Sequence, residues 1–242
     1  QNKEITANQS QNLIQYPLNE INSNPKSNKK NILIIAIDSW RFDCMTEKIT
    51  PNIYQFSKKS SQFSNHMSGA NMTTGGIFTL FYGIPATYFT AFTSIQKGPV
   101  LIDELIKQNY AVNIFSSSTV ENPPFNLNAF VKVPNLRLSS KGNSPAQRDQ
   151  NITNDWLQTI DKINDQPFFS FLFYDAAHGF DHPKSYQLPF EPSLKEVDYL
   201  AIKGDYNSEK LFNKYKNSLH FIDNEIAKVF KKLEQKQLLQ NT

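Results

Sequence analysis

The sequence contains a single cysteine, Cys44, and this scarcity already narrows the kinds of site that the chain can hold. One cysteine excludes an internal disulfide and a zinc site built from several cysteines. It leaves the cellular compartment open, because many exported bacterial proteins carry no disulfide.

Long apolar runs are also missing. No stretch approaches the ~18 apolar residues of a membrane-spanning helix, and no signal-peptide pattern opens the chain. The first residue is Gln1 rather than methionine, so we expect an excised fragment from which an upstream membrane region has been removed. Residues 1–30 are rich in Asn, Ser, Gln and Lys, and we expect a linker that follows this removed region and lies along the domain surface.

A strong charge of one sign is absent as well. The formal net charge is only +3, and no block of lysines and arginines alternates with aromatic residues, so a nucleic-acid partner is not expected. Hydrophobic residues make up 39% of the chain and charged residues 19%, which is typical of a folded protein with a real core. We expect residues 31–242 to form one α/β domain.

Three apolar runs predict the central strands of this domain. Continuous apolar runs of this length are typical of strands buried on both faces of a parallel sheet, although a buried helix segment is the alternative for the first run. Amphipathic helices are predicted between the runs, and this β-α-β order favours parallel pairing with right-handed crossovers. The fold class expected is therefore α/β, with a mostly parallel central sheet flanked by helices. The predicted strands are residues 31–38, 110–115 and 167–174, and the helices are 99–107 and 151–163.

Other segments complete the predicted architecture. Thr50 and Pro51 suit the N-cap and first position of a helix, and we expect Ile53, Phe56 and Tyr54 to form its buried stripe. A short strand is predicted over residues 62–67 and a long helix over residues 209–235. In this architecture a further strand should follow the long helix and none does, so we expect the domain to be incomplete at its C-terminus.

Three segments bring chemically useful side chains to strand ends. Asp38 ends the first strand, Thr73 and Thr74 lie in a glycine-rich loop that enters a helix, and His178 follows the third strand. Ligands of open α/β sheets bind beside the carboxyl ends of the strands. A carboxylate that holds a divalent cation, a hydroxyl at a helix N-terminus and an imidazole are suited to phosphoryl or sulfuryl transfer.

Each of these residues also has a purely structural interpretation. Asp38 or Ser39 suits a helix N-cap, and a pair of threonines caps a helix far more often than it provides a nucleophile. His178 suits a hydrogen-bonded loop histidine, and His182 either pairs with it or binds a metal. The remaining histidines, His66 and His220, have structural roles in this interpretation.

The order and wording of the motifs resemble the sulfatase/alkaline-phosphatase superfamily. The motifs are the strand ending on Asp38, the hydroxyl loop that leads into Phe81-Tyr-Gly83, the Phe173-Tyr-Asp-x-x-His-Gly179 strand end, and Tyr215-x-Asn-Ser-Leu-x-x-Ile-Asp-Asn-Glu-Ile226. More narrowly, residues 66–84 resemble the periplasmic domain of PbgA/YejM-type inner-membrane proteins. Lipoteichoic acid synthases and phosphoethanolamine transferases are more distantly similar.

This resemblance implies roles for individual residues. Asp38 matches the first metal ligand, Thr74 best matches the nucleophile that also contacts the metal, Thr73 is the next candidate, and His178 matches a substrate-contacting histidine. Gly75 departs from the pattern, because the similar inner-membrane proteins carry an aspartate there. The remaining metal ligands of the family lie in an Asp-His-Gly motif after the long helix. The implied cofactor is a divalent metal ion (Zn, Mn, Mg or Ca), at a site that is incomplete in this fragment.

Two functions follow from the resemblance. The first is a metal-dependent hydrolase or transferase of phosphate or sulfate esters, acting on lipid headgroups of the bacterial envelope. The second is a catalytically inactive domain that binds lipid or lipopolysaccharide headgroups and regulates envelope synthesis. Both place the chain in the periplasm as part of a bacterial inner-membrane protein, anchored by segments that this chain lacks. A cytosolic phosphomutase-like relative is a third and weaker interpretation.

Overall fold

The computed structural model describes residues 14–22, 28–163, 165–198 and 207–242. The predicted linker therefore falls partly outside the described residues, as does the end of the irregular segment before the last helix. Within the linker, the Tyr16 hydroxyl donates to the carbonyl of Tyr82 at 3.1 Å and accepts the backbone N–H of Val100 at 3.3 Å. This part of the leader thus lies against the domain surface.

A parallel sheet of three strands forms the centre of the molecule. The strands are β1 (Ile32–Ile37), β2 (Ala111–Ser116) and β3 (Phe168–Tyr174). Their spatial order is β1-β3-β2, and β3 pairs in parallel with both neighbours. The predicted strands and their parallel pairing are confirmed, and the carboxyl ends of all three strands meet at one edge.

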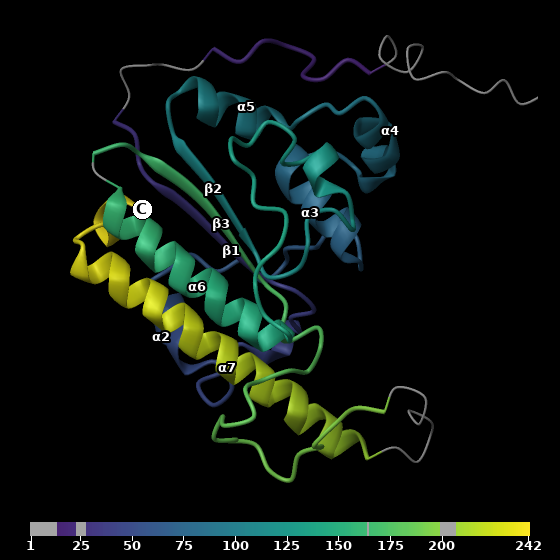
Figure 1. Cartoon of the computed structure of the whole chain (residues 1–242), viewed down its shortest axis with the longest axis vertical. Coiled ribbons are helices and arrows are strands. Elements are labelled where there is room, and N and C mark those ends of the chain that lie inside the picture. The colour runs from purple at the N-terminus through teal and green to yellow at the C-terminus, as the bar shows by residue number, and fades with distance from the viewer. Residues whose placement is uncertain (1–13, 23–27, 164, 199–206) are drawn as a thin grey trace, which may run out of the picture.

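Helices cover both faces of this sheet (Figure 1). One face carries α3, α4 and α5, and the other face carries α2, α6 and α7. The first group is α3 (Thr73–Tyr82), α4 (Phe89–Ser94) and α5 (Val100–Lys107). The second is α2 (Pro51–Ser57), α6 (Pro145–Lys162) and α7 (Ser208–Gln235). Single 3-10 turns are η1 (Phe42–Cys44), η2 (Ala86–Tyr88), η3 (Phe125–Leu127) and η4 (Leu239–Asn241).

The core divides into two clusters, one on each side of the sheet. Along β3, Phe168, Leu172 and Tyr174 pack toward α6 and α7, whereas Phe169, Phe171 and Phe173 pack toward α3 and α5. This alternation is the two-residue period of a strand, and it fills both sides because every residue of β3 is buried. The continuous apolar run is therefore the direct cause of the three-layer architecture.

Helix α2 begins as the sequence predicts, with Thr50 at the N-cap and Pro51 at the first helical position. Its capping group, however, comes from α7. The buried carboxylate of Asp223 accepts the backbone N–H groups of Asn52 and Ile53 at 3.0 and 2.8 Å. The Ile-Asp-Asn-Glu motif of the long helix thus ties α2 to α7.

Three predictions about local structure are wrong. Residues 62–67 form no strand, because their side chains are all exposed and no neighbouring strand pairs with them. Phe56 is 40% exposed and stacks on Phe230 instead of joining the buried stripe of α2. Helix α6 begins at Pro145 rather than at residue 151, because the Ser144 side chain accepts the Gln147 N–H and caps the helix earlier.

Candidate active site

The candidate site lies at the edge of the sheet where the parallel strands end. The backbone N–H of Asp38 donates to the carbonyl of Tyr174 at 2.9 Å, so the β1–β3 ladder extends to the first residue after β1. The segment after β3 turns here, with the N–H of His178 bonded to the carbonyl of Asp175 at 3.1 Å. The first turn of α3 approaches the same edge and brings its threonines to Asp38.

Thr73 is the threonine that contacts Asp38. Its hydroxyl donates to Asp38 Oδ2 at 2.8 Å, whereas among the described residues the Thr74 hydroxyl has no hydrogen-bond partner. Both threonines are half-buried. The structure therefore brings Asp38 together with Thr73, whereas the sequence analysis preferred Thr74. The roles of Asp38 and the threonines in metal binding and catalysis stay predictions.

Neither threonine caps α3. The N-cap is Met72, whose carbonyl accepts the N–H of Gly76 at 2.9 Å and which contributes no side-chain cap. Thr73 and Thr74 occupy the first two helical positions instead. Because the first N–H groups of a helix lack intrahelical acceptors, this turn presents donors and the positive end of the helix dipole beside the Thr73 hydroxyl.

The carboxylate of Asp38 does not cap a helix either. It accepts the hydroxyl of Thr73 and, at 3.4 Å, that of Ser39, while the following 3-10 turn begins after Arg41. The Asp38 side chain is 16% exposed. The carboxylate is thus held beside a threonine hydroxyl and remains open to a small ligand.

His178 faces Asp38 through Ser39. The imidazole Nδ1 lies 2.9 Å from the Ser39 hydroxyl and 4.0 Å from Asp38 Oδ2. The His178 side chain is 63% exposed, so it can contact a bound molecule without moving a packed group. Sequence reasoning treated Ser39 only as a possible cap. Its left-handed backbone, with φ of 59°, directs the chain sharply away after β1 and gave no signal in the sequence.

Tyr215 fixes this turn from α7. Its hydroxyl donates to the carbonyl of Ser39 at 2.7 Å and accepts the N–H of Arg41 at 2.8 Å. Burial raises the pKa of Tyr215 to about 12, so the phenol stays protonated and keeps donating at neutral pH. The Tyr-x-Asn-Ser motif therefore supports the site although it is distant in sequence.

Asp149 of α6 holds the turn that carries His178. Its fully buried carboxylate accepts the N–H groups of Asp175 and Ala176, each at 2.9 Å. Arg148 donates to the carbonyl of Ser117 at 2.9 Å and lies 3.4 Å from the Asp175 carboxylate. Burial raises the pKa of Asp149 to about 7. Sequence reasoning missed Asp149. The signal that could have identified it is its position in the helical repeat, which places a carboxylate on the buried face of an amphipathic helix.

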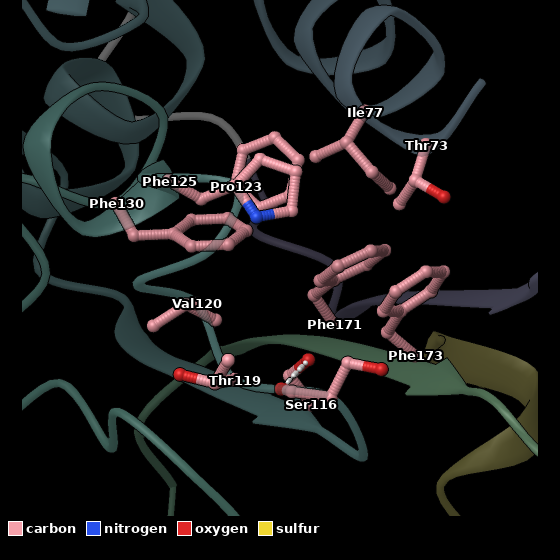
Figure 2. A pocket seen from close by; sticks show the side chains of 11 residues that line it. Thr73, Ile77, Ser116, Thr119, Val120, Pro123, Phe125, Phe130, Phe171 and Phe173 are labelled. Carbon is pink, nitrogen blue, oxygen red and sulfur yellow. Dashed lines mark hydrogen bonds between the residues drawn. The ribbon is translucent and has the colours of Figure 1, made fainter.

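A small cavity adjoins Thr73 (Figure 2). It measures about 20 Å³, room for one or two water molecules. Thr73 and Ile77 of α3 lie on one side and Phe171 and Phe173 of β3 on another. Its other lining residues are Ser116, Ser118, Thr119, Val120, Pro123, Phe125 and Phe130. The space next to the threonine is therefore mostly apolar.

The described residues do not fit a complete metal site. They contain no group of three or more His, Cys, Asp or Glu side chains that could hold an ion. Asp38 and a threonine hydroxyl are suitable oxygen donors, but tetrahedral or octahedral metals need four to six ligands. The described residues therefore supply at most two ligands of such a site.

The other histidines lie apart from this site. His182 Nδ1 is 3.2 Å from the carbonyl of Pro183, and no described contact joins it to His178. His220 Nδ1 lies 2.6 Å from the Tyr186 hydroxyl, and burial lowers the pKa of His220. His66 is exposed on the loop before α3. The structural interpretation fits His220, while His182 does not pair with His178.

Comparison with known proteins places this arrangement in context. The model of the Sulfatase family matches residues 30–242. An uncharacterized protein of Haemophilus influenzae is 28% identical over 93% of the chain, and the inner membrane protein YejM of Salmonella typhimurium is 27% identical over 76%. The periplasmic domain of the phosphoethanolamine transferase EptC from Campylobacter jejuni is 16% identical, with a TM-score of 0.59 over 87% of the chain and 66% of that domain.

The chain spans about a third of these two sequence relatives, 36% of the Haemophilus protein and 31% of YejM. The likeness to EptC, at its low identity, supports the fold alone. Among the described residues, no helix is long and apolar enough to cross a membrane.

Proposed function

The chain belongs to the sulfatase family, and from this premise we propose that its Asp38–Thr73 site cleaves or transfers phosphate or sulfate esters. The observation that carries the proposal is the hydrogen bond from Thr73, in the first turn of α3, to the carboxylate at the end of β1. A hydroxyl beside a carboxylate and a helix N-terminus has both a proton acceptor and donors for the transferring group.

Each side chain has a role in the proposed reaction. The Thr73 oxygen attacks phosphorus or sulfur, and its proton passes to Asp38. The bond to the leaving oxygen breaks, and the exposed imidazole of His178 gives that oxygen a proton. N–H groups at the start of α3 stabilise the charge on the transferring group. Water or an acceptor hydroxyl then attacks the ester on Thr73 and gives its proton to His178, while the bond to the Thr73 oxygen breaks and Asp38 returns the proton to that oxygen.

The substrate class that we propose is the phosphorylated headgroup of an envelope lipid. Like its relatives, the domain belongs to the periplasmic side of a bacterial inner-membrane protein.

Alanine substitution of each threonine tests the proposal against para-nitrophenyl phosphate and sulfate, with Mg²⁺, Mn²⁺ or Zn²⁺ supplied. We expect Thr73→Ala to abolish turnover, Thr73→Ser to restore part of it, and Thr74→Ala to retain most of it. His178→Ala should lower turnover by about 10²–10⁴-fold. Because Met72 is the N-cap of α3, neither alanine removes a capping hydroxyl, and both variants should melt within a few degrees of the parent.

A catalytically inactive domain that binds lipid or lipopolysaccharide headgroups is the second candidate. It would hold an anionic headgroup with the backbone N–H groups in the first turn of α3 and needs no complete metal site. Full turnover by both alanine variants would remove the threonines from the mechanism. If the folded whole protein that contains this chain turns over neither ester with any of the three metals, the second candidate becomes the better one.

A further inference from the structure

The loop between α2 and α3, residues 58–72, exposes large apolar side chains. Phe63 is 81% exposed, Met67 86% and Met72 64%. All residues from 58 to 69 are exposed, and no secondary structure covers them. Single exposed apolar residues are ordinary on protein surfaces, but three within ten residues of one loop form a concentration that needs a partner.

The charge of this part of the chain is one-sided. The 55 residues from Lys48 to Ile102 contain four lysines and no aspartate or glutamate. Since the whole chain has a formal charge of +3, its excess positive charge resides in this stretch. Lys58 and Lys59 open the loop and are exposed. Within this stretch of sequence the apolar side chains are accompanied by positive charge alone, and the nearest acidic group that the structure places beside it is the Asp38 carboxylate, which contacts Thr73.

Packing of the loop onto α3 places it beside the candidate active site. A Cβ atom added to Gly75 would lie 2.4 Å from the Ala70 side chain, and one added to Gly69 would lie 2.2 Å from that of Thr79. These close approaches lay the end of the loop along the helix. Met72 then directly precedes Thr73. Leu80, 47% exposed, lies two helical turns beyond Thr73 and hence on the same face of α3.

We propose that the loop 58–72 docks on the surface of an anionic lipid bilayer. Phe63 and Met67 enter the boundary between headgroups and acyl chains, while Lys58 and Lys59 contact lipid phosphates. Apolar burial and attraction to anionic lipids together are the two contributions that hold peripheral segments at a membrane. Docking in this way would hold the first turn of α3 at the bilayer surface, where a lipid headgroup can reach Thr73. The proposal does not depend on any turnover by the site.

Vesicle binding by the 242-residue chain tests this proposal. The probes are vesicles of phosphatidylcholine alone and of phosphatidylcholine mixed equally with phosphatidylglycerol. We expect the chain to sediment with the mixed vesicles, and Phe63→Ser/Met67→Ser to lower its partition coefficient by at least about tenfold. Lys58→Gln/Lys59→Gln should weaken binding about fivefold per lysine, on the mixed vesicles only. High salt should remove the lysine contribution and leave the apolar one.

Leu138→Ser provides the matched control, because Leu138 is also exposed but lies in another part of the chain. It should bind vesicles as the parent does. A fluorescence measurement gives an independent readout: the emission of Phe63→Trp should shift to shorter wavelength on the mixed vesicles, and that of Leu138→Trp should not. Circular dichroism of every variant establishes that it is folded.

Two results would overturn the proposal. One is equal vesicle binding by the parent and Phe63→Ser/Met67→Ser, or no binding by either. The other is concentration-dependent self-association of the parent that the double variant loses, without vesicle binding, which would assign the loop to a protein interface. Neither result bears on ester turnover, so failure here is distinguishable from failure of the proposed activity.

Discussion

Replacing Asp149 by asparagine tests how the turn that carries His178 is held. The buried carboxylate accepts two backbone N–H groups, from Asp175 and Ala176, and no solvent reaches it to replace either bond. A carboxamide of the same shape offers one oxygen and one NH₂ group, so one of these N–H groups loses its acceptor. The unpaired donor should cost about 1–3 kcal/mol.

The effect should depend on pH. Burial is the largest cause that raises the pKa of Asp149, from 3.8 to about 7. Between these values the unfolded chain has released the proton and the folded chain still holds it. The free energy of unfolding of the parent therefore falls as pH rises through this range, by about 1.4 kcal/mol per unit and about 4 kcal/mol in all. Asparagine does not titrate, so Asp149→Asn lacks this loss.

Urea unfolding followed by tryptophan fluorescence measures both effects, because Trp156 is buried on the same helix. We expect Asp149→Asn to be less stable than the parent near pH 5 and to approach or exceed it near pH 8. Asp161→Asn is the control on α6, because hydrogen bonding to Lys232 lowers the pKa of Asp161. The stabilisation that Asp161 gives is present above pH 4 and is lost on acidification. The stability deficit of Asp161→Asn should therefore shrink as pH falls, whereas that of Asp149→Asn should shrink as pH rises. Parallel pH profiles for the parent and Asp149→Asn would refute the reasoning.

Two further predictions concern α2 and the metal. Asp223→Ala should lower the free energy of unfolding by about 3 kcal/mol, because it leaves donors at the start of α2 without their acceptor. Asp43→Ala, which breaks an exposed ion pair with Arg41, should cost far less, and equal losses in urea melts would contradict the assigned cap. Calorimetry of this chain should detect only weak binding of Zn²⁺, Mn²⁺ or Mg²⁺, because two side-chain oxygens do not complete a coordination shell. Stoichiometric micromolar binding that Asp38→Ala abolishes would show that the chain holds a complete site.

The central strands could be predicted from the sequence because their signal is local. Ile32–Ile37 is apolar at every position and Phe168–Tyr174 at every position except Ser170, and short runs of this kind are typical of strands covered on both faces. The cap at Thr50-Pro51 is equally local. By contrast, the alternation over residues 62–67 has the period of a strand but no pairing partner, and pairing is a property of the whole sheet. The same segment instead forms the exposed loop that carries Phe63.

By itself the sequence determined the parallel α/β architecture and the convergence of Asp38, the threonine loop and His178, since strand ends of a parallel sheet must meet at one edge. Only the tertiary structure decided which threonine faces Asp38, because adjacent residues on a helix point about 100° apart. It also supplied Ser39, Tyr215 and Asp149, whose hydrogen bonds join segments more than twenty residues apart. Such bonds are fixed by the distances between packed elements, and no local pattern along the chain records them.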